Sequence, residues 1–212
     1  MATTRTERGT ARTKLLDAAV DVIRAKGFSA TSVDDLCIAA GVTKGAFFHH
    51  FDTKEALGVA AAHHWSDTTG AMFAAAEYHD VAAPAERVLG YVDLRRSLIG
   101  DGAASHTCLV GTMSQEVFDT SPSIREACAE SILGHAGTLE ADIDAALGDT
   151  ARSNGVTAAG LAVHTQVVLQ GAFVVSKAAD DPSVVLDSLD HLRRYLVGVL
   201  DTDQSEERET SS

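Results

Sequence analysis

Apolar side chains recur every three or four residues along most of this 212-residue chain, and no segment alternates apolar and polar residues over the length of a strand. A repeat of 3.6 residues places apolar side chains on one face of an α-helix, whereas a half-buried strand needs a repeat of two. The clearest helical stripe lies within residues 10–26 and consists of Leu15, Ala18, Ala19, Val22 and Ile23. The pattern predicts an all-α protein of about nine helices.

Glycine, proline and N-capping residues divide the chain into these helices, because such residues end or begin helical segments. Gly27 ends the first helix, and the pairs Ser121-Pro122 and Asp181-Pro182 begin two later ones. We expect loops at residues 100–102 and 148–155. The expected helices cover residues 10–26, 33–40, 44–51, 54–78, 84–99, 107–118, 122–147, 157–179 and 182–200.

Two short helices joined by a tight turn are expected between residues 31 and 51. Gly41 can adopt the left-handed conformation that ends a helix, and Thr43 is a suitable N-cap for the next one. The first of the two helices has one apolar face, formed by Val33, Leu36, Cys37 and Ala40. This arrangement predicts a helix-turn-helix.

The helix that begins at Lys44 has two different faces. Phe47 and Phe51 lie on one side of it, which we expect to be buried. The opposite side is open and carries no acidic residue: it consists of Gly45, Ala46 and His49, flanked by Phe48 and His50. Such a face can approach a DNA groove closely, and Lys54 follows where it can share a phosphate with backbone N–H groups.

The charge distribution agrees with a DNA-binding N-terminal part. The net charge of the whole chain is −13, which alone argues against nucleic acid. Residues 1–55, however, contain eight Lys and Arg against seven Asp and Glu, whereas residues 56–212 contain nine against twenty-three. The acidity therefore belongs to the second part of the chain.

Several other functional classes lack support in the sequence. Neither a signal peptide nor an uncharged apolar stretch of about 20 residues is evident, and three cysteines without CxxC spacing fit a reducing compartment, so we expect a cytoplasmic protein. The adjacent histidine pairs at 49–50 and 63–64 point about 100° apart, and His106 beside Cys108 lacks a third orienting group. We expect no metal, no cofactor and no enzymatic activity.

The helix-turn-helix region resembles the DNA-binding region of the TetR family of bacterial transcriptional regulators. The resemblance covers about fifty residues and rests on the runs 31–36, 39–45, 47–51 and 54–57. It implies a homodimer that places its two third helices in successive major grooves of a palindromic operator. It also implies that residues facing DNA are Thr43, Lys44, Gly45, Phe48, His49, His50 and Lys54.

Two features depart from the family pattern. Phe48 replaces a common tyrosine and so lacks one hydroxyl for a phosphate, and Asp34 and Asp35 lie close to the expected path of the DNA backbone. Arg5, Arg8 and Arg12 on an N-terminal arm can compensate through the phosphate backbone or an adjacent minor groove.

We expect a DNA-binding domain with a basic arm at residues 1–53, a ligand-binding and dimerisation domain at 54–200, and a disordered acidic tail at 201–212. Gln166 and Gln170 lie one turn apart in an apolar segment, where they either line a pocket or bond across a dimer seam. The candidate ligand-binding residues are Trp65, Phe73, Tyr91, Met113, Phe118, Gln166, Gln170 and Phe173.

The last two expected helices are the candidate dimer interface. Small residues in the first of them permit close helix approach: Gly160, Ala162, Gly171 and Ala172. The final helix carries a broad apolar stripe of Val184, Val185, Leu189, Leu192, Leu196 and Val199. Two helices from each subunit would form a four-helix bundle, unless the stripe packs within one subunit.

The sequence therefore favours a homodimeric repressor that a small, largely apolar effector releases from its operator. The alternative is an all-α small-molecule-binding or enzymatic protein that has kept the fold but lost DNA binding. The sequence identifies neither the effector nor the operator, and it does not distinguish a repressor from an activator.

Overall fold

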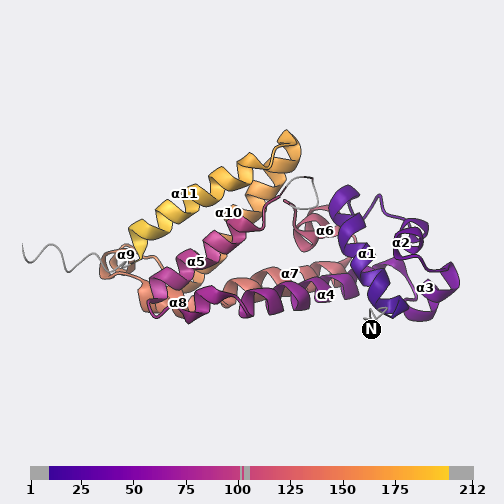
Figure 1. Cartoon of the computed structure of the whole chain (residues 1–212), viewed down its shortest axis with the longest axis horizontal. Helices are drawn as coiled ribbons and strands as arrows, with labels where there is room; N and C mark the ends of the chain where they lie inside the picture. The colour runs from indigo at the N-terminus through magenta and orange to yellow at the C-terminus, as the bar shows by residue number, and fades with distance from the viewer. Residues whose placement is uncertain (1–9, 101, 103–105, 201–212) are drawn as a thin grey trace, which may run out of the picture. The chain divides into compact units, whose positions relative to one another are not determined.

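The computed structural model of the chain describes residues 10–100, 102 and 106–200. The expected N-terminal arm with Arg5 and Arg8 and the expected acidic tail lie outside these residues. The described part is helical throughout, which confirms the all-α architecture (Figure 1). Its helices are α1 (Ala11–Lys26), α2 (Val33–Ala40), α3 (Lys44–His50), α4 (Lys54–Ala74), the 3-10 helix η1 (Glu77–Asp80), α5 (Pro84–Ser97), α6 (Leu109–Val117), α7 (Pro122–Gly137), α8 (Glu140–Ala146), α9 (Asp149–Ser153), α10 (Ala158–Ala179) and α11 (Ser183–Val199).

The described residues contain eleven α-helices rather than about nine. The segment expected as one helix over 122–147 divides into α7 and α8, because tight hydrogen bonds from the Thr138 and Leu139 N–H groups to carbonyls three residues earlier end α7. The loop expected at 148–155 contains the short helix α9, and α4 ends at Ala74, four residues earlier than expected. Periodicity identifies long helices but does not register such one-turn interruptions.

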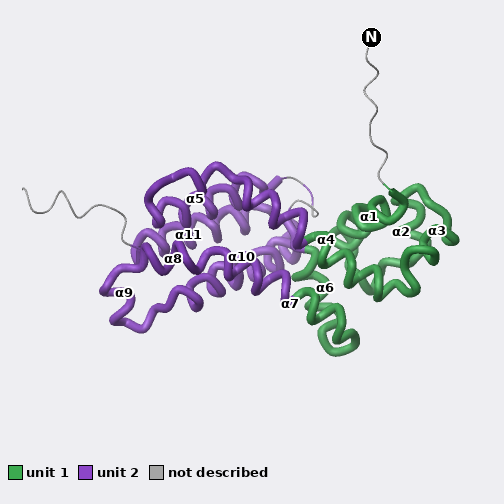
Figure 2. Tube along the Cα trace, turned by 90° about the horizontal axis from the view of Figure 1, so that it is seen from below, with its two compact units in different colours: residues 1–65, 109–128 green, residues 66–108, 129–212 purple. Residues whose placement is uncertain are grey.

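The chain forms two compact units that do not follow the chain order (Figure 2). Unit 1 combines residues 1–65 with residues 109–128, and unit 2 combines residues 66–108 with residues 129–212. Helices α4 and α7 therefore each contribute residues to both units. The functional division at residues 53 and 54 stays a prediction.

The core of unit 1 forms around α1, which packs against α2, α3 and α6. Leu15, Ala19 and Ile23 of the expected stripe are completely buried, and so are Leu36 of α2 and Phe47 of α3. Val22 is only partly buried. Burial of these side chains fixes the two helices of the helix-turn-helix on α1.

The core of unit 2 includes the apolar stripe of the last helix. Val185, Leu189, Leu192 and Leu196 of α11 are at most 3% exposed within one subunit. They pack with residues of α5, α8 and α10. These four residues are therefore not available to a dimer seam, in agreement with the alternative that the stripe packs within the subunit, whereas Val184 and Val199 of the same stripe are only partly buried. The hydrophobic effect alone does not tell an internal helix face from an interface.

Helix α10 differs from the expectation that no apolar stretch of the chain is long enough to cross a membrane. By length and composition it is apolar enough to cross a membrane, with a mean hydropathy of 1.5 over its best 18-residue window. The core helix of a folded domain passes the same test, and Leu161, Ala162, Leu169 and Ala172 of α10 are buried in unit 2.

We expect Leu192→Ala to lower the free energy of unfolding by about 2–5 kcal/mol, because it removes a buried side chain and leaves a cavity. Leu133→Ala in α7 is the matched control and should cost under about 0.5 kcal/mol, since Leu133 is 56% exposed. Chemical denaturation at several protein concentrations measures both. Equal losses for the two variants would contradict the observed burial of Leu192.

Candidate nucleic-acid interface and effector site

The start of α2 is fixed by a capping box. Asp35 Oδ2 accepts a hydrogen bond from the Ser32 N–H at 2.8 Å, and the Asp35 N–H donates to Ser32 Oγ at 3.1 Å. Lys26 Nζ lies 2.7 Å from the same carboxylate. The hydrogen bonds from Lys26 and Ser32 hold the pKa of Asp35 well below its ordinary value. Asp35, expected near the DNA backbone, is therefore paired within the protein.

The turn between α2 and α3 has the expected geometry. Gly41 has φ 63° and ψ 39°, the left-handed conformation that glycine adopts without strain. The Val42 N–H donates to the Cys37 carbonyl at 3.0 Å, and Thr43 Oγ1 accepts from the Ala46 N–H at 3.2 Å. Cys37 is buried, as expected for a core residue.

The faces of α3 are as the periodicity predicts. Phe47 is completely buried and Phe51 is 5% exposed, whereas Phe48 is 54% exposed. The other residues on the outer side of α3 are also accessible to solvent: Thr43, Lys44, Gly45 and His49 are exposed, and His50 is partly exposed. Seven consecutive residues thus present one apolar face inward and one face of small, aromatic and imidazole groups outward.

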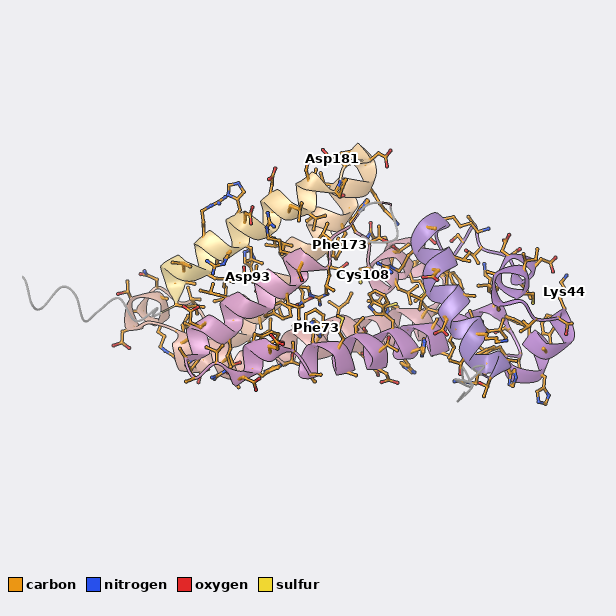
Figure 3. The ribbon with its side chains drawn as sticks, in the orientation of Figure 1. Lys44, Phe73, Asp93, Cys108, Phe173 and Asp181 are labelled. Carbon is orange, nitrogen blue, oxygen red and sulfur yellow. The ribbon has the colours of Figure 1, made fainter. Side chains whose placement is uncertain are left out.

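Lys44 makes an ion pair with Asp34 across the turn, and its ammonium lies 2.7 Å from Asp34 Oδ1. The hydrogen bond to this carboxylate raises the pKa of Lys44. Both side chains are about 60% exposed, and such surface pairs contribute little net free energy. A DNA phosphate can therefore replace Asp34 as the partner of Lys44 at small cost. Lys44, the first residue of α3, is labelled in Figure 3.

Lys54 is less available than expected. Its ammonium donates to the carbonyls of Phe28 at 3.0 Å and of Thr31 at 2.9 Å, and it lies 4.4 Å from the centroid of the Phe28 ring. Two of its three N–H groups thus hold the loop that precedes α2, which leaves one for a phosphate. Arg12 also differs from expectation, because it belongs to α1 and stacks over the Phe51 ring at 5.5 Å.

A contact that the sequence did not indicate joins α6 to this loop. Glu116 Oε2 accepts a hydrogen bond from the Ser29 N–H at 2.8 Å, across 87 residues of chain. Gly27 has φ 91°, and a Cβ atom there would lie 2.0 Å from Glu116 Oε1. The glycine was recognised as a helix stop, but no local pattern shows that its missing side chain makes room for a carboxylate.

Unit 2 contains a buried polar cluster around Tyr91, which is 1% exposed. Its hydroxyl accepts from Gln166 Nε2 at 2.9 Å and from Arg95 Nε at 2.9 Å, and lies 3.1 Å from His135 Nε2. Burial, reinforced by the charge of Arg95, lowers the pKa of His135 from its usual 6.5 to about 4. Nε2 of a neutral His135 can accept a hydrogen bond from the Tyr91 hydroxyl, which then donates one hydrogen bond and accepts two.

The structure brings together only some of the candidate ligand-binding residues. Phe73, Tyr91 and Gln166 meet in this cluster, and the Phe73 ring lies 5.3 Å from that of Tyr91. Gln170 and Phe173 are partly buried on α10 of the same unit. Trp65, Met113 and Phe118 belong instead to unit 1, where Met113 is buried, Phe118 is 60% exposed and Arg24 stacks over Trp65. Sequence reasoning missed Arg95 and His135.

Comparison with known proteins identifies the family. Residues 15–61 match the model of the bacterial regulatory proteins of the tetR family. The HTH-type transcriptional repressor KstR2 of Rhodococcus jostii is 46% identical over 46 residues, which are 22% of each chain. The HTH-type transcriptional repressor NemR of Escherichia coli is 30% identical over 129 residues, which are 58% of this chain and 62% of that one.

Solved structures agree over a longer span. The reduced form of E. coli NemR superimposes with a TM-score of 0.72 at 21% identity, covering 92% of this chain and 100% of that one. The regulatory protein TetR from Rhodobacter sphaeroides superimposes with a TM-score of 0.74 at 22% identity, covering 88% of this chain and 99% of that one.

The chain belongs to the TetR family. The sequence matches to KstR2 and NemR span less than two thirds of the length of those relatives. The structural likeness shows that the fold continues beyond the matched N-terminal part. Within the described residues of this TetR-family protein, no group of three or more His, Cys, Asp or Glu side chains is placed to hold a metal ion.

We expect Gly27→Ala to lower the free energy of unfolding by about 1–3 kcal/mol, because its φ of 91° is strained for a residue with a side chain and the new Cβ displaces Glu116. Gly134→Ala in α7 is the matched control. It should raise stability by about 0.5–1 kcal/mol, since that glycine lies in a helix and has open space around it. Denaturation of both variants should therefore give changes of opposite sign; a stabilised Gly27→Ala protein would contradict the account.

Stability should also depend on pH through His135. Its pKa is lower in the folded state, so the unfolded chain binds the proton more readily between pH 6.5 and 4. The free energy of unfolding is unaffected by this group above about pH 6.5 and falls by up to about 3 kcal/mol as the pH drops to about 4. His135→Gln should remove this part of the acid sensitivity. His191→Gln, at an exposed position, should keep it, and identical pH profiles for wild type and His135→Gln would disprove the assignment.

Proposed function

We propose that this TetR-family protein is a transcriptional repressor that binds a palindromic operator as a homodimer and is released by a small organic effector. The observation that carries the proposal is the outer face of α3. Its exposed residues are small, aromatic or basic, and its inner face is anchored by the completely buried Phe47. A rigidly held helix with such a face can enter a major groove, where base edges are distinguished.

The residues of the interface have different roles in this proposal. Gly45 allows close approach of the backbone, His49 reaches base edges, and Lys44 exchanges Asp34 for a phosphate. Thr43, Phe48 and His50 complete the contact surface, and Lys54 contributes its remaining N–H. Asp35 keeps Lys26 as its partner within the protein, which reduces the repulsion between this carboxylate and the DNA backbone.

Homodimerisation is proposed through the outer sides of α10 and α11. The buried stripe of α11 is not available, but a second set of apolar residues on these helices is 38–59% exposed: Val163, Val167, Val174, Val175, Tyr195 and Val197. Exposed apolar patches commonly mark interaction surfaces. Gly160 and Gly171 are exposed on α10 and allow close approach there, whereas Ala162 and Ala172 are buried. A two-fold pairing of helices from each subunit fits this surface.

Effector binding is proposed for unit 2, because it holds the buried polar cluster around Tyr91. An effector shifts the protein between conformations only by its difference in affinity for them. The Glu116 contact to the Ser29 N–H links α6 to the loop before α2, so movement of α6 changes the support of the helix-turn-helix. We propose a cytoplasmic protein without enzymatic activity, in keeping with relatives that are named transcriptional repressors.

Selection of bound duplexes from a random DNA library by the purified protein tests this function. Recovery of a palindrome whose log affinity falls steeply with log salt supports the regulator, because phosphate contacts release counterions. The protein is first refolded to remove a co-purified effector. If it then enriches no sequence, the result contradicts the proposed function and favours a ligand-binding protein that has lost DNA binding. Phe48 in place of tyrosine is the residue that motivates this alternative.

Two substitutions separate base reading from phosphate binding. Lys44→Ala should weaken binding to all DNA sequences similarly and reduce the slope of log affinity against log salt concentration by about one. His49→Ala should also relax the preference for particular bases within the half-site. Arg125→Ala, at an exposed position of α7, is the control and should change neither. Competition assays with half-site variants measure these effects. A uniform loss for both variants would remove the base-reading role of His49.

A further inference from the structure

Within the described part of the chain, Arg95 has no acidic partner, unlike Arg87 and Arg96, the other two arginines of α5. Four arginines of unit 2 each pair with an aspartate at 2.6–3.0 Å: Arg87 with Asp142, Arg96 with Asp190, Arg152 with Asp144 and Arg193 with Asp93. Arg95 is more buried than Arg96 beside it, yet within the described part of the chain its hydrogen bonding is confined to Nε. This is unusual in a part of the chain that contains an excess of acidic residues.

The guanidinium of Arg95 is nevertheless held in one orientation. Its Nε–H donates to the Tyr91 hydroxyl at 2.9 Å, and its Cζ lies 4.2 Å from the centroid of the Phe73 ring. Tyr91 is itself fixed by Gln166 and His135. These contacts occupy the Nε edge and one face of the guanidinium, which leaves the edge formed by Nη1 and Nη2 for another partner.

Among the residues that the structure describes, His135, Tyr78 and Asp142 do not neutralise the guanidinium charge. His135 is uncharged at neutral pH, and burial raises the pKa of nearby Tyr78 to about 12, so that phenol is uncharged too. Asp142, a carboxylate close enough to influence Tyr78, pairs with Arg87 at 2.6 Å. A partly buried cation without a counter-ion is costly, and an arriving anion relieves that cost.

We propose that the Nη1–Nη2 edge of Arg95 binds the carboxylate of a small organic acid with an apolar body. A planar carboxylate matches the two parallel N–H groups of this edge, and its single negative charge balances the single positive charge of the cluster. This inference rests on the proposed function and names the chemical class of the effector.

The apolar body of the acid has aromatic neighbours in the same unit. Phe73 and Tyr91 flank the guanidinium, with ring centroids 5.3 Å apart. On α10, Gln170 and Phe173 follow Gln166 at intervals of four and seven residues, which places all three on one side of the helix. Phe73 and Phe173 are labelled in Figure 3, on α4 and α10 respectively. Apolar walls with a few fixed polar groups are typical of small-ligand sites.

Isothermal titration of the full-length protein with a defined panel tests the proposal without DNA. The probes are straight-chain carboxylates of four to twelve carbons, benzoate, phenylacetate and naphthoate, each with its primary amide. We expect at least one acid to bind about tenfold or more tightly than its amide, because only the acid provides a charged bidentate acceptor.

Variants assign this preference to Arg95. Arg95→Gln should reduce the affinity for that acid at least about tenfold, bringing it close to that of the amide. Arg95→Lys keeps the charge and should recover only part of the affinity, since an ammonium lacks the planar fork. Arg194→Gln, at an exposed arginine of α11, should bind as the wild type does. Circular dichroism establishes that each variant is folded.

The inference is overturned if no acid in the panel binds more tightly than its amide, or if folded Arg95→Gln and Arg95→Lys both retain wild-type affinity for the acid. These results are independent of the function proposed above. An operator found by duplex selection, together with no preference for acids, refutes this inference alone. An acid that binds through Arg95, in a protein that selects no DNA, supports the site and refutes the repressor.

Discussion

Burial of Phe47 is the constraint on which the proposed function of this protein depends. Phe47 is completely buried in unit 1, while the adjacent Phe48 is 54% exposed. Because neighbouring helical residues point about 100° apart, fixing one ring in the core fixes the rotation of the whole of α3. The same rotation directs Gly45 and His49 outward. The core buries Phe47 and not Phe48, and this choice determines which residues of α3 form its outer face.

Local sequence rules predicted this part of the molecule well, because its determinants are close together in the chain. The Gly41 turn, the Thr43 N-cap and the faces of α3 each depend on interactions within about five residues. The division into about nine helices was less accurate, since one hydrogen-bonded turn at Thr138 and Leu139 separates α7 from α8. Helix propensity gives only a weak signal for such a break.

Contacts between distant residues were not predictable in the same way. Glu116 meets Ser29 across 87 residues, and Gln166 meets Tyr91 across 75. Lys54 was expected beside a phosphate, but it bonds to two carbonyls of the preceding loop. The amphipathic stripe of α11 was correctly recognised as apolar, but four of its residues pack within the subunit. Periodicity shows which side of a helix avoids water and not what covers it.

Amide hydrogen exchange of the protein, free and bound to a duplex that it selects, tests most directly whether α3 is the DNA-reading element. Binding should slow exchange in the α2–α3 turn and in residues 43–50, with little direct protection over the exposed side of α8 in unit 2. Unchanged exchange in α3, with protection confined to unit 2, would contradict the assignment of this helix as the DNA-binding surface.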